Sequence, residues 1–474
     1  MGQVMLITAV SMIPALVISI TNGEKSSITA FAATLGFFSV TGLLLVLFRQ
    51  RQDVNTMHAK EGFLVVGLSW ILLSVIGALP FYFSGSVNSF IDALFESISG
   101  FTTTGASIFT DVEALPKSIL YWRSFSQWIG GLGVLIFLLA VSSSAGGRSV
   151  HLMRAEVPGP NKGKLMPRLK DTAKMLCLIY LSLTVLEILL LATGGMPVFD
   201  SVLHAFGTAA TGGFAIKNTS IAFYNNAYFE GVIAVFMVLF GINFHVFYLL
   251  ILRRFSGIFR NEELRYYLFI IAGAILIIMA DLAISGVSVL RSFRLASFQV
   301  AANVTTTAYH SSDFNLWPKL SQVVLVFLMF VGACGGSTSG GIKVSRILIM
   351  FKDTKRKIRH MIHPSSTQIV LMNGQQVSSE SVTRIYAFFF AYCLILVGST
   401  LIISLDNLDL VSSVTAVVAS LNNVGPGLGV VGPRGSYNVF SDFSKILLSF
   451  DMLLGRLEIF PIIMVFSPSV WRNR

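Results

Sequence analysis

The chain has 474 residues, of which 54% are hydrophobic and only 12% are charged. A soluble globular domain carries about 25% charged residues, so this composition excludes an ordinary soluble protein and predicts an all-α, multi-pass membrane protein. The net charge of +11 does not indicate a nucleic-acid partner, because Lys and Arg are concentrated in segments between apolar spans, where they report orientation in a bilayer.

Ten apolar segments along the chain are predicted to cross the membrane, since about 20 apolar residues span a bilayer core of about 30 Å. The first is expected to be a retained helix and not a signal peptide, because it has no basic start and contains Pro14. The predicted spans are residues 4–21, 28–48, 63–83, 121–140, 173–193, 229–252, 266–285, 320–351, 386–404 and 445–466.

Basic residues occupy alternate connections between these spans, which predicts that those connections and both termini face the cytoplasm. The opposite side is poorer in basic residues and carries acidic ones, among them Asp92 and Asp200. The basic connections contain Arg49, Arg51 and Lys60, then residues 148–174, 253–265 and 352–359, and finally Arg472 and Arg474.

Four further apolar segments are too short to span a bilayer, and each runs into a turn rich in Gly, Thr or Asn. They are predicted to be re-entrant pore helices, because non-helical backbone is tolerated at membrane depth only where it is buried or lines a water-filled path. The segments are Phe90–Phe101, Phe199–Ala209, Leu290–Val304 and Leu410–Leu421. Aligned without gaps on Phe95, Leu203, Phe298 and Thr415, they reach Gly105, Gly213, Ala308 and Gly425 ten residues later.

This common spacing predicts four turns around one axis that present backbone carbonyl oxygens to a cation. Rings of carbonyls can replace the hydration shell of a passing ion, and glycine allows the positive φ angles that such turns need. Helix C-termini pointing to the centre also favour a cation. The residues expected to form this filter are Thr103, Thr104, Gly105, Thr211, Gly212, Gly213, Thr306, Thr307, Ala308, Asn423, Val424 and Gly425. Asp92 and Asp200 are expected to cap their pore helices, to attract cations, or both.

A glycine-rich stretch, Gly332–Lys343, interrupts the predicted span 320–351. So many glycines cannot form a stable helix, so the stretch is expected to be an irregular loop at membrane depth. It is either a movable gate across the ion path or a kink that lets helices approach closely; the intramembrane charge of Lys343 favours the gate. The gate residues are expected to be Gly335, Gly336, Ser337, Gly340, Gly341 and Lys343.

Arg456 places a positive charge inside the last predicted span. Such a charge either faces the pore as an electrostatic barrier or forms a structural ion pair with Asp451 or Glu458. Glu187 lies near the outer end of its span, where an interfacial position is expected.

No enzymatic constellation is evident in the sequence. The seven histidines are scattered, the three cysteines have no metal-ligand spacing, and no nucleophile elbow, zinc helix motif or phosphate loop occurs. We therefore expect a protein without covalent chemistry and without a bound cofactor, apart from ions in its pore.

The turns 102–107, 210–214 and 422–429, the stretch Gly332–Lys343 and the segment Gly455–Pro461 together resemble the TrkH-like membrane subunit of Trk/Ktr-type potassium uptake systems, over essentially the whole chain. The resemblance implies an N-terminal helix pair followed by four helix–pore loop–helix repeats with pseudo-fourfold symmetry, at residues 1–50, 51–150, 151–260, 261–365 and 366–474. It also implies K⁺ uptake across a bacterial cytoplasmic membrane, a homodimer and a cytosolic nucleotide-binding ring that controls gating.

Ala308 departs from the glycine that the family has in the third turn. Its Cβ disfavours positive φ and narrows that quadrant, which puts strict K⁺ selection in question. Two alternatives therefore stay open: a less selective K⁺/Na⁺ pathway, and a symporter coupled to H⁺ or Na⁺ through Asp451 or Glu458.

Overall fold

A computed structural model describes residues 2–48, 59–142, 169–365 and 368–468 of the chain. The predicted helical class is confirmed, because the described residues form helices joined by turns and longer loops, with one small antiparallel hairpin of β1 (Leu371–Met372) and β2 (Gln375–Gln376). The basic residues expected at Arg49, Arg51, Arg472, Arg474 and within 148–168 lie outside the described residues.

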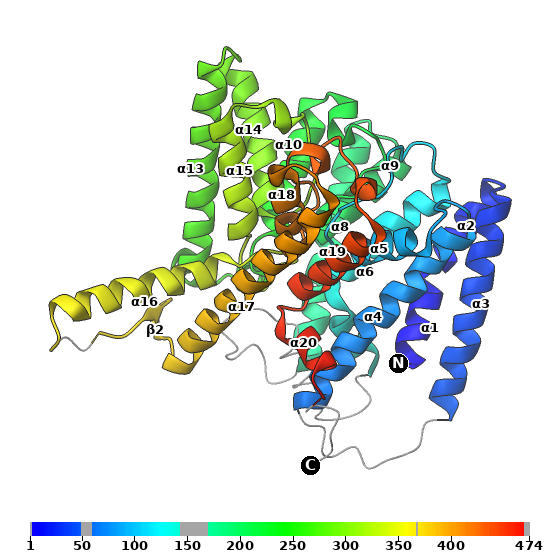
Figure 1. Cartoon of the computed structure of the whole chain (residues 1–474), viewed down its shortest axis with the longest axis horizontal. Coiled ribbons are helices and arrows are strands. Elements are labelled where there is room, and N and C mark those ends of the chain that lie inside the picture. The colour runs from blue at the N-terminus through cyan, green and yellow to red at the C-terminus, as the bar shows by residue number, and fades with distance from the viewer. Residues whose placement is uncertain (1, 49–58, 143–168, 366–367, 469–474) are drawn as a thin grey trace.

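The helices follow one another along the chain as Figure 1 shows. They are α1 (Gly2–Ser11), α2 (Ile13–Thr21), α3 (Lys25–Leu47), α4 (Ala59–Phe83), α5 (Phe90–Phe101), α6 (Lys117–Ser142), α8 (Leu169–Thr193), α9 (Val198–Ala210), α10 (Ala227–Phe240), α11 (Phe244–Ile251), α12 (Phe255–Phe259), α13 (Glu262–Ile284), α14 (Val289–Val304), α15 (Lys319–Val331), α16 (Val344–Ile362), α17 (Ser379–Ile403), α18 (Leu410–Leu421), α19 (Asp442–Arg456) and α20 (Phe460–Phe466).

The four predicted pore helices are present. Helices α5 and α18 have the predicted bounds, α9 is one residue longer at each end, and α14 is one residue longer at its start. Each is shorter than the roughly 20 residues that a bilayer crossing needs.

The expectation of ten spans holds only in part. Within the described residues, six helical segments are long and apolar enough to cross a membrane, and α10 with α11 would be a seventh. The six are Gly2–Thr21, Lys25–Leu47, Leu64–Phe83, Lys174–Thr193, Glu262–Ile284 and Ser379–Asp406.

Two spans predicted to be continuous are broken. Helices α10 and α11 bend by 92° at a break of three residues, where Asn243 caps α11 by accepting the His245 N–H at 2.9 Å. The last span breaks between α19 and α20 because Glu458 and Ile459 have positive φ angles of 58° and 69°, and Pro461 then starts α20.

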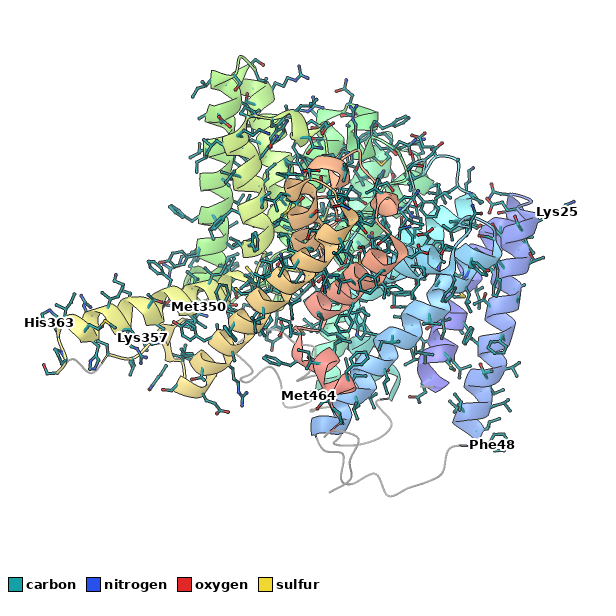
Figure 2. The ribbon with its side chains drawn as sticks, viewed as in Figure 1. Lys25, Phe48, Met350, Lys357, His363 and Met464 are labelled. Carbon is teal, nitrogen blue, oxygen red and sulfur yellow. The ribbon has the colours of Figure 1, made fainter. Side chains whose placement is uncertain are left out.

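The N-terminal helices pack at one edge of the molecule. Figure 2 labels Lys25 and Phe48 at the two ends of α3, whose outer side exposes large apolar side chains such as Phe37 and Leu47. Glu24, just before α3, accepts the backbone N–H groups of Lys117 and Ser118, the latter at 3.3 Å, and so binds the start of α6. An apolar outer side is what a helix facing lipid requires.

Helix α16 projects away from the rest of the molecule, and Lys357 and His363 mark its outer part (Figures 1 and 2). Its buried side holds Asp353, which pairs with Arg356 at 2.7 Å and Lys357 at 3.0 Å and accepts the Tyr386 hydroxyl of α17 at 3.1 Å.

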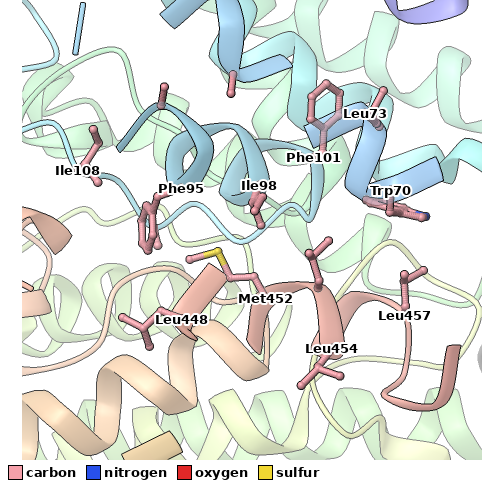
Figure 3. Packing of buried hydrophobic residues seen from close by; sticks show 14 of the residues in the cluster. Trp70, Leu73, Phe95, Ile98, Phe101, Ile108, Leu448, Met452, Leu454 and Leu457 are labelled. Carbon is pink, nitrogen blue, oxygen red and sulfur yellow. The ribbon is translucent and has the colours of Figure 1, made fainter. Parts of the chain in front are cut away.

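The pore helices are buried by close packing. Figure 3 shows Phe95 and Ile98 of α5 facing Leu448 and Met452 of α19. Lipid is as apolar as these side chains, so their contribution in a membrane comes from dispersion contacts and shape fit.

The backbones of α5 and α6 approach each other closely. A Cβ built on Gly130 would overlap the carbonyl oxygen of Phe101, whereas a Cβ built on Gly273 of α13 would meet no atom within 4 Å. The small residue at Gly130 therefore lets the two helices pack closely.

We predict opposite effects of alanine at these two glycines. Gly130→Ala must displace backbone and should destabilise the protein by at least about 1–3 kcal/mol. Gly273→Ala should be neutral or stabilising by up to about 1 kcal/mol, because Gly weakens helix interiors. Thermal unfolding in detergent, followed by fluorescence-detected size-exclusion chromatography, measures both; equal melting temperatures for the two variants would contradict this packing.

Candidate functional site

The four positions aligned from the sequence lie together in the structure. A Cβ built on Gly105, Gly213 or Gly425 would lie 3.1, 2.9 or 3.0 Å from the Cβ of Ala308. All four positions also line one outer hollow of about 100 Å³. The turns that follow α5, α9, α14 and α18 therefore converge on one point.

Each glycine in this group abuts a carbonyl oxygen of a neighbouring turn. A Cβ on Gly105 would overlap the oxygen of Gly212, a Cβ on Gly213 would overlap that of Thr307, and a Cβ on Gly425 would lie 2.6 Å from that of Thr104. Contacts thus join the first turn to the second, the second to the third and the fourth to the first. Glycine is required there because a side chain has no room.

All four pore helices end in the same hydrogen-bonded cap. In each, the residue before the aligned position donates its N–H to a carbonyl five residues earlier: Thr104 to Ser99, Gly212 to Gly207, Thr307 to Ala302 and Val424 to Ala419, at 2.8–2.9 Å. This is the long bond of a Schellman motif, which satisfies carbonyls that a helix end leaves free.

The left-handed residue of that motif is normally glycine, but here it is Thr or Asn. Thr103, Thr211, Thr306 and Asn423 have φ angles of 56°, 55°, 58° and 53°. A β-branched residue rarely adopts this conformation, and backbone strain of this kind persists only where the surrounding structure enforces it. Ala308 also has positive φ, 68°.

Buried side chains hold the turns in place. Thr102 and Thr104 share a hydrogen bond of 2.7 Å, and Thr305 and Thr307 share one of the same length. Asn423 donates to the Thr104 hydroxyl at 3.0 Å, which ties the fourth turn to the first.

The outer hollow has a basic lining, which differs from the acidic mouth that the sequence predicts. Its lining includes Arg123, Lys217 and Arg434. Lys217 forms an ion pair with Glu113 at 3.4 Å, and Arg434 forms one with Asp313 at 3.8 Å. A hydrogen bond from Asn218 lowers the pKa of the nearby Asp111 carboxyl, which keeps that exposed group charged.

Asp92 and Asp200 cap neither pore helix. Asp92 pairs with Lys445 at 2.6 Å, and Asp200 accepts the Tyr224 hydroxyl at 2.6 Å. The cap of α5 is Ser89, which accepts the N–H of Ile91. Both carboxylates are thus tied to side chains from other elements.

The glycine-rich stretch between α15 and α16 forms the predicted irregular loop. Its Gly340 N–H donates to the Thr306 hydroxyl at 2.8 Å, and its Gly341 N–H donates to the Asn422 carbonyl at 3.0 Å. The loop therefore rests directly on the third and fourth turns. Positive φ angles at Gly332, Gly336, Gly341 and Lys343 produce its path.

Contacts outside the turns anchor the start of this loop and the beginning of α16 that follows it. Glu263, buried near the start of α13, accepts the N–H of Gly335 at 2.7 Å and that of Ser345 at 3.2 Å. The Phe244 N–H donates to the Gly336 carbonyl at 3.1 Å, so the loop contacts the start of α11 at the bend between α10 and α11. Sequence reasoning missed Glu263, which looks like an ordinary acid in the first turn of a helix.

The two intramembrane cations predicted to matter both contact loop carbonyls. Lys343 is buried and donates to the Ser339 carbonyl. Arg456 donates to the Thr338 carbonyl at 2.8 Å and to the Gly130 carbonyl of α6 at 2.5 Å, so it links the loop to a neighbouring helix.

The two carboxylates considered as partners of Arg456 have other contacts. Glu458 pairs with Arg346 at 2.6 Å, and Asp451 accepts the Ser399 hydroxyl at 3.0 Å. Glu187 is fully buried, which corrects the interfacial position expected for it. Another buried acid, Glu96, pairs with Arg123 at 2.7 Å beside the first turn; the sequence offered no signal for this pairing, because the two residues lie on different helices.

Comparison with known proteins matches this chain to one family over nearly its full length. Residues 26–473 match the TrkH family, described as a cation transport protein. The Trk system potassium uptake protein TrkH of Salmonella typhimurium is 36% identical, over 93% of this chain and 92% of the relative. The Trk system potassium uptake protein TrkG of Escherichia coli is 36% identical, over 100% of this chain and 97% of the relative. The crystal structure of the potassium transporter TrkH from Vibrio parahaemolyticus superimposes with a TM-score of 0.88 at 31% identity, covering 99% and 98% of the two chains.

The anchoring of the loop can be tested through Cys334, which lies inside it and is buried. In a chain with Cys177 and Cys393 replaced by Ala, we predict that Glu263→Gln increases the maleimide labelling rate of Cys334 by about tenfold. The reason is that loss of the charged acceptor of the Gly335 and Ser345 N–H groups weakens the anchoring of the loop by about 1.5 kcal/mol, which corresponds to a factor of about ten. Glu262→Gln, on the same helix turn but paired with Lys352, is the control and should leave labelling unchanged. Equal rates in the two variants would contradict the anchor.

Proposed function

Because this chain belongs to the TrkH family and is a TrkH-like, multi-pass membrane subunit of the Trk potassium transporter type, we propose that it carries K⁺ into the cell through a gated, channel-like pore. The observation that supports this most directly is the convergence of four similarly capped turns at Gly105, Gly213, Ala308 and Gly425. In this proposal the four turns are the selectivity filter of a pseudo-fourfold pore.

The filter acts by replacing water around the ion. Carbonyl oxygens of four turns provide a cage of dipoles, and four pore helices direct their negative ends to its centre. The shared Schellman caps and the buried Thr and Asn contacts keep these carbonyls in place, so little reorganisation is required when an ion enters. The twelve residues named from the sequence line or support this cage.

The loop Gly332–Lys343 is proposed to be the gate. It is bonded to the third and fourth turns through Thr306 and Asn422, and Arg456 ties it to α6. Opening requires these bonds to break, and the buried positive charge of Lys343 then leaves the ion path. Gly335, Gly336, Ser337, Gly340 and Gly341 supply the backbone freedom for that movement.

The remaining features belong to the same proposal. The N-terminal helix pair, residues 1–50, precedes four repeats at 51–150, 151–260, 261–365 and 366–474, with both termini in the cytoplasm of a bacterial cell. The protein works as a homodimer controlled by a cytosolic nucleotide-binding ring, for which basic segments such as α16 are suitable contacts.

We expect the Ala308 methyl group to limit both flux and selectivity, because it occupies space among three glycines and has positive φ. In proteoliposomes, ⁸⁶Rb⁺ uptake should rise in Ala308→Gly, and the preference for K⁺ over Na⁺ as competitor should increase by up to about tenfold, equivalent to about 1.4 kcal/mol. The variant should also be more stable by about 1 kcal/mol, since a strained residue is removed. Gly213→Asp is the blocked control. Uptake that is equal in wild type and Gly213→Asp would refute the pore, and unchanged Na⁺ competition in Ala308→Gly would refute the role of the methyl group.

A coupled symporter is the second candidate, and one observation favours it. Asp451 is buried in α19, and its second carboxylate oxygen has no hydrogen-bond partner within the described residues. Glu458, the other acid considered, is engaged by Arg346 and is less suitable.

Our primary proposal predicts that a K⁺ gradient drives ⁸⁶Rb⁺ uptake without proton movement. It also predicts that Asp451→Asn retains uptake within about twofold, because a pore does not need a carboxylate that binds and releases a proton. A pH-sensitive dye inside the liposomes measures the proton flux. Acidification that accompanies uptake and disappears in Asp451→Asn would support the symporter instead.

A further inference from the structure

A buried ion pair lies directly beside the first and second turns. Glu96 of α5 and Arg123 of α6 are 0% and 2% exposed, and the Arg123 Nε atom lies 2.7 Å from a Glu96 carboxylate oxygen. Removing both charges from water is unfavourable, and it is offset only when the remaining donors and acceptors are also satisfied.

Those remaining atoms bind the backbone that leaves the two turns. Glu96 accepts the Ser107 hydroxyl at 3.1 Å and the Ile108 N–H at 3.0 Å. Arg123 donates to the Ser107 hydroxyl and to the Ala215 carbonyl, both at 3.1 Å. Ser107 and Ala215 each stand two residues after their aligned glycines, Gly105 and Gly213, so one ion pair grips equivalent points of neighbouring turns.

Aromatic rings fix the plane of the guanidinium group. Its carbon lies 4.3 Å from the Phe214 ring centre and 5.4 Å from that of Phe109. Arginine offers a rigid, planar set of donors that lysine lacks, so lysine at this position would keep the charge and lose the geometry.

The other pore helices carry no charge at the position of Glu96. The ungapped alignment places His204, Gln299 and Ala416 there. In the fourth repeat, Leu428 occupies the position that Ile108 has in the first. Its N–H donates to the Thr415 hydroxyl at 2.9 Å, as the Ile108 N–H donates to Glu96. Among the four pore helices, a charged residue at this position therefore occurs only next to the boundary between the first and second turns.

We propose that Glu96 and Arg123 are positioning residues that set the spacing between the first and second turns and thereby the discrimination between K⁺ and Na⁺. This inference rests on the proposed function. Because discrimination depends on the number and spacing of carbonyl dipoles around the ion, a looser boundary admits the smaller ion more readily.

The test compares variants of the full chain in proteoliposomes by ⁸⁶Rb⁺ uptake with K⁺ or Na⁺ as competitor. Glu96→Gln and Arg123→Lys should each reduce the preference for K⁺ over Na⁺ by about tenfold, and Ser107→Ala, which leaves the ion pair intact, by about threefold. Arg294→Gln is the matched control: it removes the 2.7 Å pair of Arg294 with Glu230, which makes no contact with a turn, and should leave the preference unchanged.

The outcomes separate the inference from the proposed function. Wild-type uptake combined with wild-type preference in folded Arg123→Lys and Ser107→Ala would overturn the positioning role. A general loss of uptake in Glu96→Gln and Arg294→Gln alike, with no change in preference, would overturn it too, because it would make both pairs purely structural. Size-exclusion profiles identify any variant that does not fold, and Ser107→Ala then decides. Absence of ⁸⁶Rb⁺ uptake in the wild type would count against the pore itself.

Discussion

The close approach of four backbone turns is the constraint on which the rest of this structure depends. Three glycines and Ala308 stand so near one another that an added Cβ meets either a neighbouring carbonyl oxygen or the Ala308 methyl group. All four helices that lead into these turns end through the same Schellman bond with a left-handed Thr or Asn. The strain of those residues is sustained by buried hydroxyl and amide contacts and, beside the first and second turns, by the Glu96–Arg123 ion pair.

Three charged residues around the loop Gly332–Lys343 form hydrogen bonds with backbone groups. Lys343 and Arg456 donate to carbonyls, and Glu263 accepts N–H groups, so the loop below the turns is held by charged hydrogen bonds to main chain. Such bonds are stronger than neutral ones but each can be exchanged for another carbonyl or for water. In the proposed gate, a loop held in this way is stable when closed and can open without separating a buried ion pair.

The sequence predicts much of the helical framework and of the site because both depend on local patterns. The bounds of α5 and α18 follow from short apolar runs that end at Thr and Asn, and the ungapped alignment identifies residues that meet in space although they are about 100 positions apart along the chain. The bend between α10 and α11 escaped prediction because it depends on a contact with Gly336 from a distant loop. Pairs such as Glu96 with Arg123 and Asp92 with Lys445 were not predicted for the same reason, because the sequence does not indicate which charged residues on separate helices will pair.

All four turns of the proposed filter come from one chain, which has a consequence for how the proposed pathway can change. In an assembly of four identical subunits, any substitution next to the ion is imposed on every quadrant at once. Here the substitution at Ala308 alters one quadrant while Gly105, Gly213 and Gly425 remain as they are. Ion preference can therefore be adjusted in steps of one methyl group, and each quadrant is free to evolve, or to be engineered, independently of the other three.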